Sequence, residues 1–275
     1  MSYPYLESVL LDLTGIDTGT QFIPMFGLLV ISALLISLHF GKKKLAELNV
    51  KDLDGEYFET TIFYAFVGGL IGAKLLHVFE FRGYGIADQL FSRGGFSIYG
   101  GLILGFITAI FMLKRKKIAI LSATDIAAPY IMLAYGIGRI GCQISGDGDW
   151  GQKVNMAAKP SWLPDWFWTQ TYDNNVAGQF IPAPGVYPTP MYETLLAFVS
   201  FFILRACFKF KASAVGFTFA MYLILSAVNR FMVEFIRINP RYDVLGFELS
   251  QSQIISLVVL SAGLFFLVKS LKQSK

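Results

Sequence analysis

The chain has 275 residues, of which 55% are hydrophobic and only 15% are charged. Its mean hydropathy of +0.55 is too high for a water-soluble domain of this length and indicates a polytopic membrane protein. The net charge of +4 is modest and comes from loop lysines, so we expect no nucleic-acid surface.

The first 20 residues contain Glu7, Asp12 and Asp17 but no lysine or arginine. A secretory signal peptide begins with a basic segment, so we expect no cleavable signal here.

Seven apolar runs follow along the chain. Each is long enough to cross a hydrocarbon core of ~30 Å, which takes ~20 helical residues. They are expected at residues 20–40, 58–80, 96–114, 124–145, 190–208, 214–236 and 248–268. The sequence therefore predicts an all-α membrane protein with seven transmembrane helices, built as one integral-membrane domain over residues 1–275.

Lysine and arginine are unevenly divided between the two sets of loops. Fourteen lie in loops 41–57, 114–122 and 205–213 and in the C-terminal tail, against six in the N-terminal segment and the other loops. Because cytoplasmic loops are enriched in these residues, we expect the N-terminus outside and the C-terminus in the cytoplasm. Cys142 and Cys207 then lie near opposite faces, beyond the ~7 Å limit for a disulfide, and we expect two free thiols.

Segment 146–189 differs in composition from the apolar runs. It is rich in proline and contains all four tryptophans of the chain: Trp150, Trp162, Trp166 and Trp168. Tryptophan is enriched at the boundary between bilayer and water. We expect a small extracytoplasmic cap between the fourth and fifth spans, too short to be an independent domain.

Ionisable or phenolic side chains gather in the outer third of four predicted spans. They are Lys74, His77, Tyr99, Arg139, Arg230, Glu234 and Arg237. A charged group at membrane depth is costly and persists mainly where it faces a polar interior or a partner. The inner two thirds of the spans hold almost none, which disfavours the alternative of a transporter or channel for a small anion.

The less deeply placed residues also have structural interpretations. Lys74 and His77 could extend outward from a helix end. Tyr99 could be one more interfacial aromatic, and Cys142 a small buried side chain. With only two histidines in the chain, we expect no metal site built from a histidine cluster.

The arginines need partners at this depth. Arg230 and Glu234, four residues apart on one helix face, could form a structural ion pair. Arg237 and Arg241 are expected at the surface, where they would contact lipid phosphates or water. Arg139 is the deepest and has no acid three or four residues away on its own helix. Its partner must therefore be an anionic ligand or a residue from elsewhere, such as Glu234.

Two arginines, and with them Lys74, suit a phosphate at the outer boundary between acyl chains and headgroups. Arginine offers a planar fork for phosphate oxygens. The glycine-rich turn at residues 145–149 could bring backbone N–H groups close to such a ligand. These residues together predict a cationic pocket for an anionic phospholipid whose tails lie between helices.

The stretch GRIGCQISGDGDWG at residues 138–151 resembles the signature of bacterial prolipoprotein diacylglyceryl transferases, which usually reads GRIGNFINGE-x-WG. Three more segments resemble family segments in the same order. GGFSIYGGLILG (94–105) is similar to the segment ending in HGGL, YPTPMYETLLAF (187–198) to HPxQLYE, and NRFMVEFIR (229–237) to RFxxEFxR. Four ordered segments over most of the chain make the resemblance specific.

The resemblance implies an enzyme of the bacterial inner membrane with its active site toward the periplasm. It would move the diacylglyceryl group of phosphatidylglycerol onto the lipobox cysteine of a prolipoprotein signal peptide, the first step of lipoprotein maturation. The products would be a thioether-linked lipid and glycerol 1-phosphate. Neither a cofactor nor a metal is implied.

The resemblance also implies residue roles. The predicted catalytic residues are Arg139, Arg230, Glu234 and Tyr99. The predicted phosphatidylglycerol-binding residues are Arg139, Arg230, Gly146, Asp147, Asp149 and Gly151, together with Lys74, which its charge and depth place near the phosphate. Either Asp147 or Asp149 would stand in for the signature glutamate, because the turn has one extra residue.

Three positions depart from the family pattern. Tyr99 replaces the histidine before GGL, Cys142 the signature asparagine, and Phe26 a tyrosine often found early in the first helix. A tyrosine of pKa ~10 is a weak base for a thiol of ~8.5. Nearby arginines could favour its phenolate, or could stabilise the incoming thiolate directly. The second hypothesis is therefore a family member that binds phospholipid or signal peptide without the chemistry.

Overall fold

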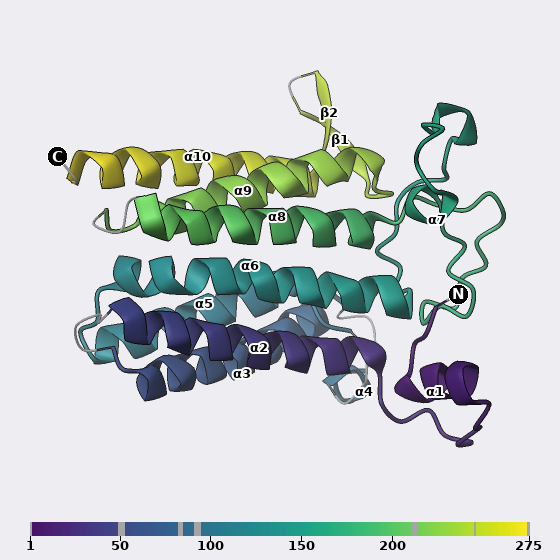
Figure 1. Ribbon diagram of the computed structural model, residues 1–275, viewed down its shortest axis with the longest axis horizontal. Coiled ribbons are helices and arrows are strands. Elements are labelled where there is room, and N and C mark those ends of the chain that lie inside the picture. Colours follow the sequence, from purple (N-terminus) through teal and green to yellow (C-terminus); the bar gives the residue numbers. More distant parts are fainter. Residues whose placement is uncertain are drawn as a thin grey trace. The chain divides into compact units, whose positions relative to one another are not determined.

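The computed structural model describes residues 2–48, 53–81, 85–90, 95–210, 214–244 and 246–273. Its elements are α1 (Leu6–Thr14), α2 (Met25–Leu48), α3 (Gly55–Glu80), α4 (Ile86–Leu90), α5 (Ile98–Arg115), α6 (Ile120–Ser145), η1 (Met156–Ala158), α7 (Asp165–Trp168), α8 (Thr189–Phe210), α9 (Phe217–Val233), η2 (Glu234–Ile236), β1 (Arg241–Val244), β2 (Phe247–Ser250) and α10 (Gln251–Gln273) (Figure 1). Among the described residues, seven helices are long and apolar enough to cross a membrane. Each overlaps one predicted run, which confirms the seven apolar spans by length and composition.

A β-hairpin between α9 and α10 is the main difference from the predicted fold (Figure 1). Strands β1 and β2 pair antiparallel, with Arg241 opposite Ser250. Because β2 occupies residues 247–250, α10 begins at residue 251 rather than at the predicted 248. The fold is therefore mostly helical, and the all-α prediction was wrong at this hairpin.

The chain divides into two compact units. The first contains Met1–Ser37 and Ala127–Lys275, and the second contains Leu38–Ile126. Both cysteines, Cys142 and Cys207, belong to the first unit and are free thiols, as the sequence predicted.

In the second unit, α3 packs against α5 through glycine. A Cβ on Gly72 would collide with the carbonyl oxygen of Gly100, and a Cβ on Gly100 would collide with that of Gly72. Small residues allow membrane helices to approach to backbone contact. The N–H of Ser97 also donates to the carbonyl of Ala73 at 2.9 Å, which fixes the start of α5 beside α3.

In the first unit, α8 packs against α9, and α9 packs against α10. The buried core contains Tyr130, Met132, Ala197, Phe201 and Leu204. Asn229 Nδ2 on α9 donates to Ser200 Oγ on α8 at 2.8 Å. This packing places Glu193, near the start of α8, beside Arg230, near the end of α9. A cluster of charged side chains forms at this end of α8 and α9.

Segment 146–189 is mostly irregular and has a small core of its own. Trp150 is buried and stacks on Tyr172, with ring centroids 5.2 Å apart. Tyr172 Oη donates to Gln143 Oε1 at 2.7 Å, which ties the segment to the end of α6. Trp162 and Trp166, in contrast, are 79% and 61% exposed.

Candidate active site

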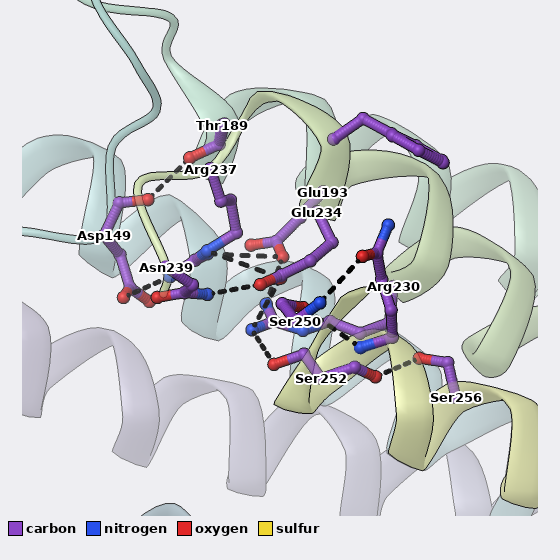
Figure 2. Close-up of polar contacts among 12 residues, drawn as sticks. Asp149, Thr189, Glu193, Arg230, Glu234, Arg237, Asn239, Ser250, Ser252 and Ser256 are labelled. Carbon is purple, nitrogen blue, oxygen red and sulfur yellow. Dashed lines mark hydrogen bonds and ion pairs between the residues drawn. The ribbon is translucent and has the colours of Figure 1, made fainter. Parts of the chain in front are cut away.

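The carboxylate of Glu193 is the centre of an arginine cluster in the first unit. Glu193 lies near the start of α8 and is 2% exposed. Its Oε2 lies 2.7 Å from Nε of Arg139 on α6, and its Oε1 lies 2.9 Å from Nη1 of Arg230 on α9. The same Oε1 lies 3.6 Å from Nη1 of Arg237 (Figure 2). One buried carboxylate thus orients guanidinium groups from three segments of the chain.

Glu234 is a second buried acid, at the point where α9 tightens into η2. Its Oε2 lies 3.3 Å from Nη2 of Arg230, and its Oε1 accepts a hydrogen bond from Asn239 Nδ2 at 2.6 Å. Arg230 Nη2 also donates to Ser252 Oγ at 3.0 Å. Arg230 is therefore held by three partners: Glu193, Glu234 and Ser252 (Figure 2).

Arg237 belongs to the same cluster and is only 7% exposed. The chain becomes extended at this residue, with φ −81° and ψ 160°, and its backbone forms an antiparallel bridge with Gly151. The N–H of Gln152 donates to the carbonyl of Ile236 at 2.7 Å. This change of direction carries the arginine into the cluster, so its predicted surface position was wrong. Arg241 is exposed, as predicted.

Asp149 bridges two of the arginines. One carboxylate oxygen contacts Nη1 of Arg139. The other lies 2.7 Å from Nη2 of Arg237 (Figure 2). Thr189 Oγ1 donates to the main-chain carbonyl of Asp149 at 2.5 Å. Burial raises the pKa of Asp149, but the charges of Arg139 and Arg237 outweigh burial and lower this pKa to about 2. Burial lowers the pKa of Arg237, but Asp149 and Glu193 raise it above its ordinary value.

The turn that carries Asp149 depends on glycine. Gly146 and Gly148 have φ of 63° and 98°, in the left-handed region that favours glycine. A Cβ on Gly151 would lie 2.5 Å from the carbonyl oxygen of Ile236. Glycine therefore allows segment 146–189 to approach the end of α9 closely, which places Asp149 among the arginines.

The side chain of Arg139 has further neighbours on its own helix. Its Nε donates to Tyr135 Oη at 3.2 Å, and its Nη1 donates to Cys142 Sγ at 3.5 Å. Sγ of Cys142 and carboxylate oxygens of Asp147 and Asp149 lie within 4.8 Å of one another, as metal ligands could. Because Asp149 and Cys142 already face guanidinium groups, positive charge opposes a cation here, and we assign no metal.

The cluster is formally neutral. Its charged members are Arg139, Arg230, Arg237, Asp149, Glu193 and Glu234. The expected cationic pocket is thus corrected, because each arginine is matched by an acid. Among the described residues, Glu193 Oε2, Glu234 Oε2 and both Nε and Nη1 of Arg237 are buried and make ion pairs but no hydrogen bond.

A family model described as prolipoprotein diacylglyceryl transferase matches residues 15–269. The chain belongs to the prolipoprotein diacylglyceryl transferase family.

Several proteins named phosphatidylglycerol–prolipoprotein diacylglyceryl transferase are similar to the chain over most of its length. The protein from Leptospira interrogans is 27% identical, with 89% of this chain and 88% of the relative covered. The protein from Staphylococcus haemolyticus is 28% identical, with 94% and 88% covered. The protein from Clostridium botulinum is 30% identical, with 84% and 88% covered.

Four residues that the resemblance assigned to the diacylglyceryl transferase site lie in one cluster. They are Arg139, Arg230, Glu234 and Asp149. Of the two candidate aspartates, Asp149 contacts the arginines, while Asp147 Oδ1 accepts a hydrogen bond from the N–H of Asp149 at 3.2 Å. Their roles in catalysis or lipid binding stay predictions.

Lys74 and Tyr99 belong to the second unit. Lys74 Nζ lies 3.5 Å from the carbonyl oxygen of Gly95 and 4.7 Å from the ring centroid of Phe96. Tyr99 is partly buried in the first turn of α5. Their assignments to the diacylglyceryl transferase site also stay predictions.

Sequence reasoning missed two members of the cluster, Glu193 and Arg237. Glu193 lies in the segment that resembles HPxQLYE, so the family pattern offered a signal for it. Arg237 ends the segment that resembles RFxxEFxR and lies seven residues after Arg230, so helical spacing placed it on the same face as Arg230 and Glu234. Its position just beyond the predicted span nevertheless indicated the surface, whereas the structure buries it where the chain becomes extended.

Proposed function

We propose that the protein transfers the diacylglyceryl group of phosphatidylglycerol to the lipobox cysteine of prolipoproteins, the first step of lipoprotein maturation. One observation carries this proposal. Arg139 and Arg230, from two segments that match the family, contact the same buried carboxylate, Glu193. Membership of the family and the names of the relatives support it.

In this reaction the cysteine sulfur bonds to a glyceryl carbon as the bond from that carbon to the phosphate oxygen breaks. The electron pair leaves with glycerol 1-phosphate, and the thiol proton ends on this phosphate monoester or in water. Negative charge therefore grows on the leaving phosphate, where preorganised donors lower the barrier most. We assign to Arg139 the contact with the leaving phosphate. We assign to Arg230, fixed between Glu193 and Glu234, the role of holding the Glu193 carboxylate that also contacts Arg139.

The turn after α6 completes the headgroup site in this proposal. Gly146 and Gly151 hold the turn in place, and Asp147 and Asp149 are its polar side chains. Lys74 is assigned to lipid binding from its expected place near the outer end of the second span, and Tyr99 is assigned to the region of the attacking thiol from the resemblance.

We infer the orientation from loop charge. Fourteen basic residues on one side against six on the other support a cytoplasmic C-terminus and an extracytoplasmic N-terminus. The site then faces the periplasm in a bacterial inner membrane. Segment 146–189 is assigned as a cap, within a single integral-membrane domain, that helps to admit the signal peptide from outside. Seven apolar helices fit a multi-pass membrane protein.

Lipidation of a synthetic lipobox peptide by the purified protein tests the proposal, with mass spectrometry detecting the thioether product. Product should form with phosphatidylglycerol and not with diacylglycerol, which has no phosphate to leave. Arg139→Ala should lower kcat by ~100- to 1,000-fold, as loss of one oxyanion donor does. Arg139→Lys keeps the charge but not the fork and should also be impaired. Arg115→Ala, at an exposed position in the last turn of α5, is the matched control.

Full activity of Arg139→Ala, measured on folded protein, would remove that arginine from the mechanism. Absence of product with every lipid, despite a folded protein, would refute the transferase assignment itself.

The binding-only alternative rests on Tyr99 in place of the family histidine. It predicts that phosphatidylglycerol and peptide bind but that no thioether forms. Tyr99→His should then create activity where the native chain has none. If the native chain is an enzyme that uses the phenol, Tyr99→Phe should lower its rate, and the comparison of the three proteins separates the two hypotheses.

A further inference from the structure

The two carboxylate oxygens of Asp149 are shared between two arginines. One contacts Nη1 of Arg139, and the other lies 2.7 Å from Nη2 of Arg237. The phosphate of a phospholipid also presents two free oxygens on one central atom. Guanidinium groups bind carboxylate and phosphate in the same charge-assisted geometry. Asp149 thus makes the contacts that a phosphate would make in its place.

We propose that the Asp149 carboxylate occupies the phosphate position between Arg139 and Arg237 and is displaced when a phosphate group binds. This inference rests on the proposed function, because it names the residues that the phosphatidylglycerol headgroup would contact. It also identifies Arg237, rather than Arg230, as the second arginine in direct contact with phosphate.

The charge balance requires a displacement. The cluster already holds three acids against three arginines: Asp149, Glu193, Glu234, Arg139, Arg230 and Arg237. A phosphate added beside three retained carboxylates would be repelled at close range in a poorly solvated site. Exchange of the carboxylate for the singly charged phosphodiester of phosphatidylglycerol leaves the charge of the cluster unchanged.

Asp149 is the acid that can leave. Its side chain is 37% exposed, whereas those of Glu193 and Glu234 are 2% and 0% exposed. Glu193 is built into α8, and Glu234 is also tied to Asn239. Asp149 sits on a glycine-rich turn anchored through its main-chain carbonyl by Thr189. We therefore expect the carboxylate to rotate toward solvent while the main chain stays in place.

Arg237 is the arginine with hydrogen-bonding capacity to offer. Its Nε and Nη1 are buried but make no hydrogen bond among the described residues. Arg230, in contrast, already directs its Nη1 to Glu193 and its Nη2 to Ser252. Nε and Nη1 of Arg237 lie 3.9 Å from Glu234 Oε2 and 3.6 Å from Glu193 Oε1, which is ion-pair range but longer than a hydrogen bond. A phosphate between Arg139 and Arg237 would therefore meet an arginine whose hydrogen-bonding capacity is not filled by the two glutamates.

The test measures binding of phosphate compounds to full-length protein in detergent. Radiolabelled glycerol 1-phosphate reports the soluble phosphate monoester, and KM for phosphatidylglycerol in mixed micelles reports the lipid headgroup. Diacylglycerol, which has no phosphate, reports the acyl site alone. Asp149→Asn should tighten both phosphate ligands by about 3- to 10-fold, as expected for loss of a partly exposed competing ion pair, and leave diacylglycerol unchanged.

Asp173→Asn is the matched control, because Asp173 lies exposed in the same segment and accepts a hydrogen bond from Thr171. Arg237→Gln should weaken both phosphate ligands and abolish the gain that Asp149→Asn gives, which a double-mutant cycle detects. Thermal unfolding of each variant confirms that the compared proteins are folded.

Weaker or unchanged phosphate binding in folded Asp149→Asn would overturn the inference, because Asp149 would then only position the arginines. Phosphate binding that is insensitive to Arg237→Gln would overturn it as well. The transferase proposal fails on a different result, namely no thioether product from the native chain. Tighter phosphate binding by Asp149→Asn would support the inference even in that case.

Discussion

Replacement of Glu193 by glutamine tests whether one carboxylate organises the arginine cluster. Glutamine keeps the size of the side chain but removes its charge and one of its two acceptor oxygens. Glu193 is 2% exposed and lies 2.7 Å from Arg139 and 2.9 Å from Arg230. The new NH₂ group must face one of these guanidinium groups as donor against donor, which pushes that arginine out of position.

The expected size of the effect follows from burial. Removing one partner of a buried ion pair costs about 3–5 kcal/mol because a charge stays buried and unpaired. Arg139 keeps Asp149 and Arg230 keeps Glu234, so we expect ~3 kcal/mol in the free energy of unfolding, at the lower end of that range. Displacement of a catalytic guanidinium by ~1 Å costs on the order of 100-fold in rate, and we expect that loss in kcat/KM.

The assay combines equilibrium unfolding in detergent, followed by tryptophan fluorescence, with lipidation kinetics on the folded protein. Glu248→Gln makes the same chemical change at an exposed position in β2 and should stay within ~0.5 kcal/mol of the native chain. If Glu193→Gln matches Glu248→Gln in both measurements, the organising role is refuted. Lower stability with unchanged kcat/KM would show that the carboxylate stabilises the fold without positioning the reactive groups.

Three further predictions concern the same region. Gly151→Ala places a Cβ 2.5 Å from a main-chain oxygen and should cost ~1–3 kcal/mol in unfolding experiments, whereas Gly138→Ala, whose Cβ meets nothing within 4 Å, should cost nothing. The pKa of Asp149 is lowered from 3.8 to about 2, so its stabilising contribution is complete above its unfolded pKa and is lost as pH falls through its folded pKa. The difference in unfolding free energy between the native chain and Asp149→Asn should therefore be constant from about pH 5 to 8 and shrink below about pH 4, and a step near neutrality would contradict the ion pair. Cys142→Asn gives Arg139 Nη1 a better acceptor than the sulfur now 3.5 Å away and should retain kcat/KM, whereas Cys142→Leu, with no acceptor, should lower it by about tenfold.

Hydropathy predicted the parts of the fold that depend on local sequence. Seven apolar runs are visible in the sequence because each must match the thickness of a bilayer. The sequence did not predict which helices meet: Gly72 and Gly100 permit a close approach, and the structure shows that they bring α3 and α5 together. The hairpin was not predicted, although Asp243 and Gly246 are turn residues, because each strand has only four residues and β2 runs directly into the apolar helix α10.

The site was only partly predictable, because its geometry depends on contacts between distant segments. Arg139 and Arg230 stood out because charge at membrane depth is expensive. Arg237 lies seven residues after Arg230, so helical spacing put it on the same face, but its place just beyond the predicted span indicated the surface. The structure pairs its backbone with Gly151, which lies far away in sequence, and buries its side chain.

Glu193 shows why composition suggested the wrong net charge for the pocket. As a single acid near the start of an apolar run, it has no charged neighbour in sequence to reveal its role. Its partners come from α6, α9 and the residue after η2. Counting intramembrane arginines therefore overestimated the positive charge that a ligand would meet.

A neutral cluster also solves a physical problem that a purely cationic pocket would create. Three guanidinium groups packed together without counter-charge would repel one another and destabilise the folded protein in the absence of substrate. The two buried glutamates hold Arg139 and Arg230 in place through ion pairs. The more exposed Asp149 balances the charge of the third arginine, Arg237. Substrate phosphate can then enter by exchange with Asp149, so the arginines are already oriented when negative charge develops on the leaving group. Binding and catalysis would therefore share one set of donors, and the strength of the Asp149 bridge would limit how tightly phosphate is held before and after the reaction.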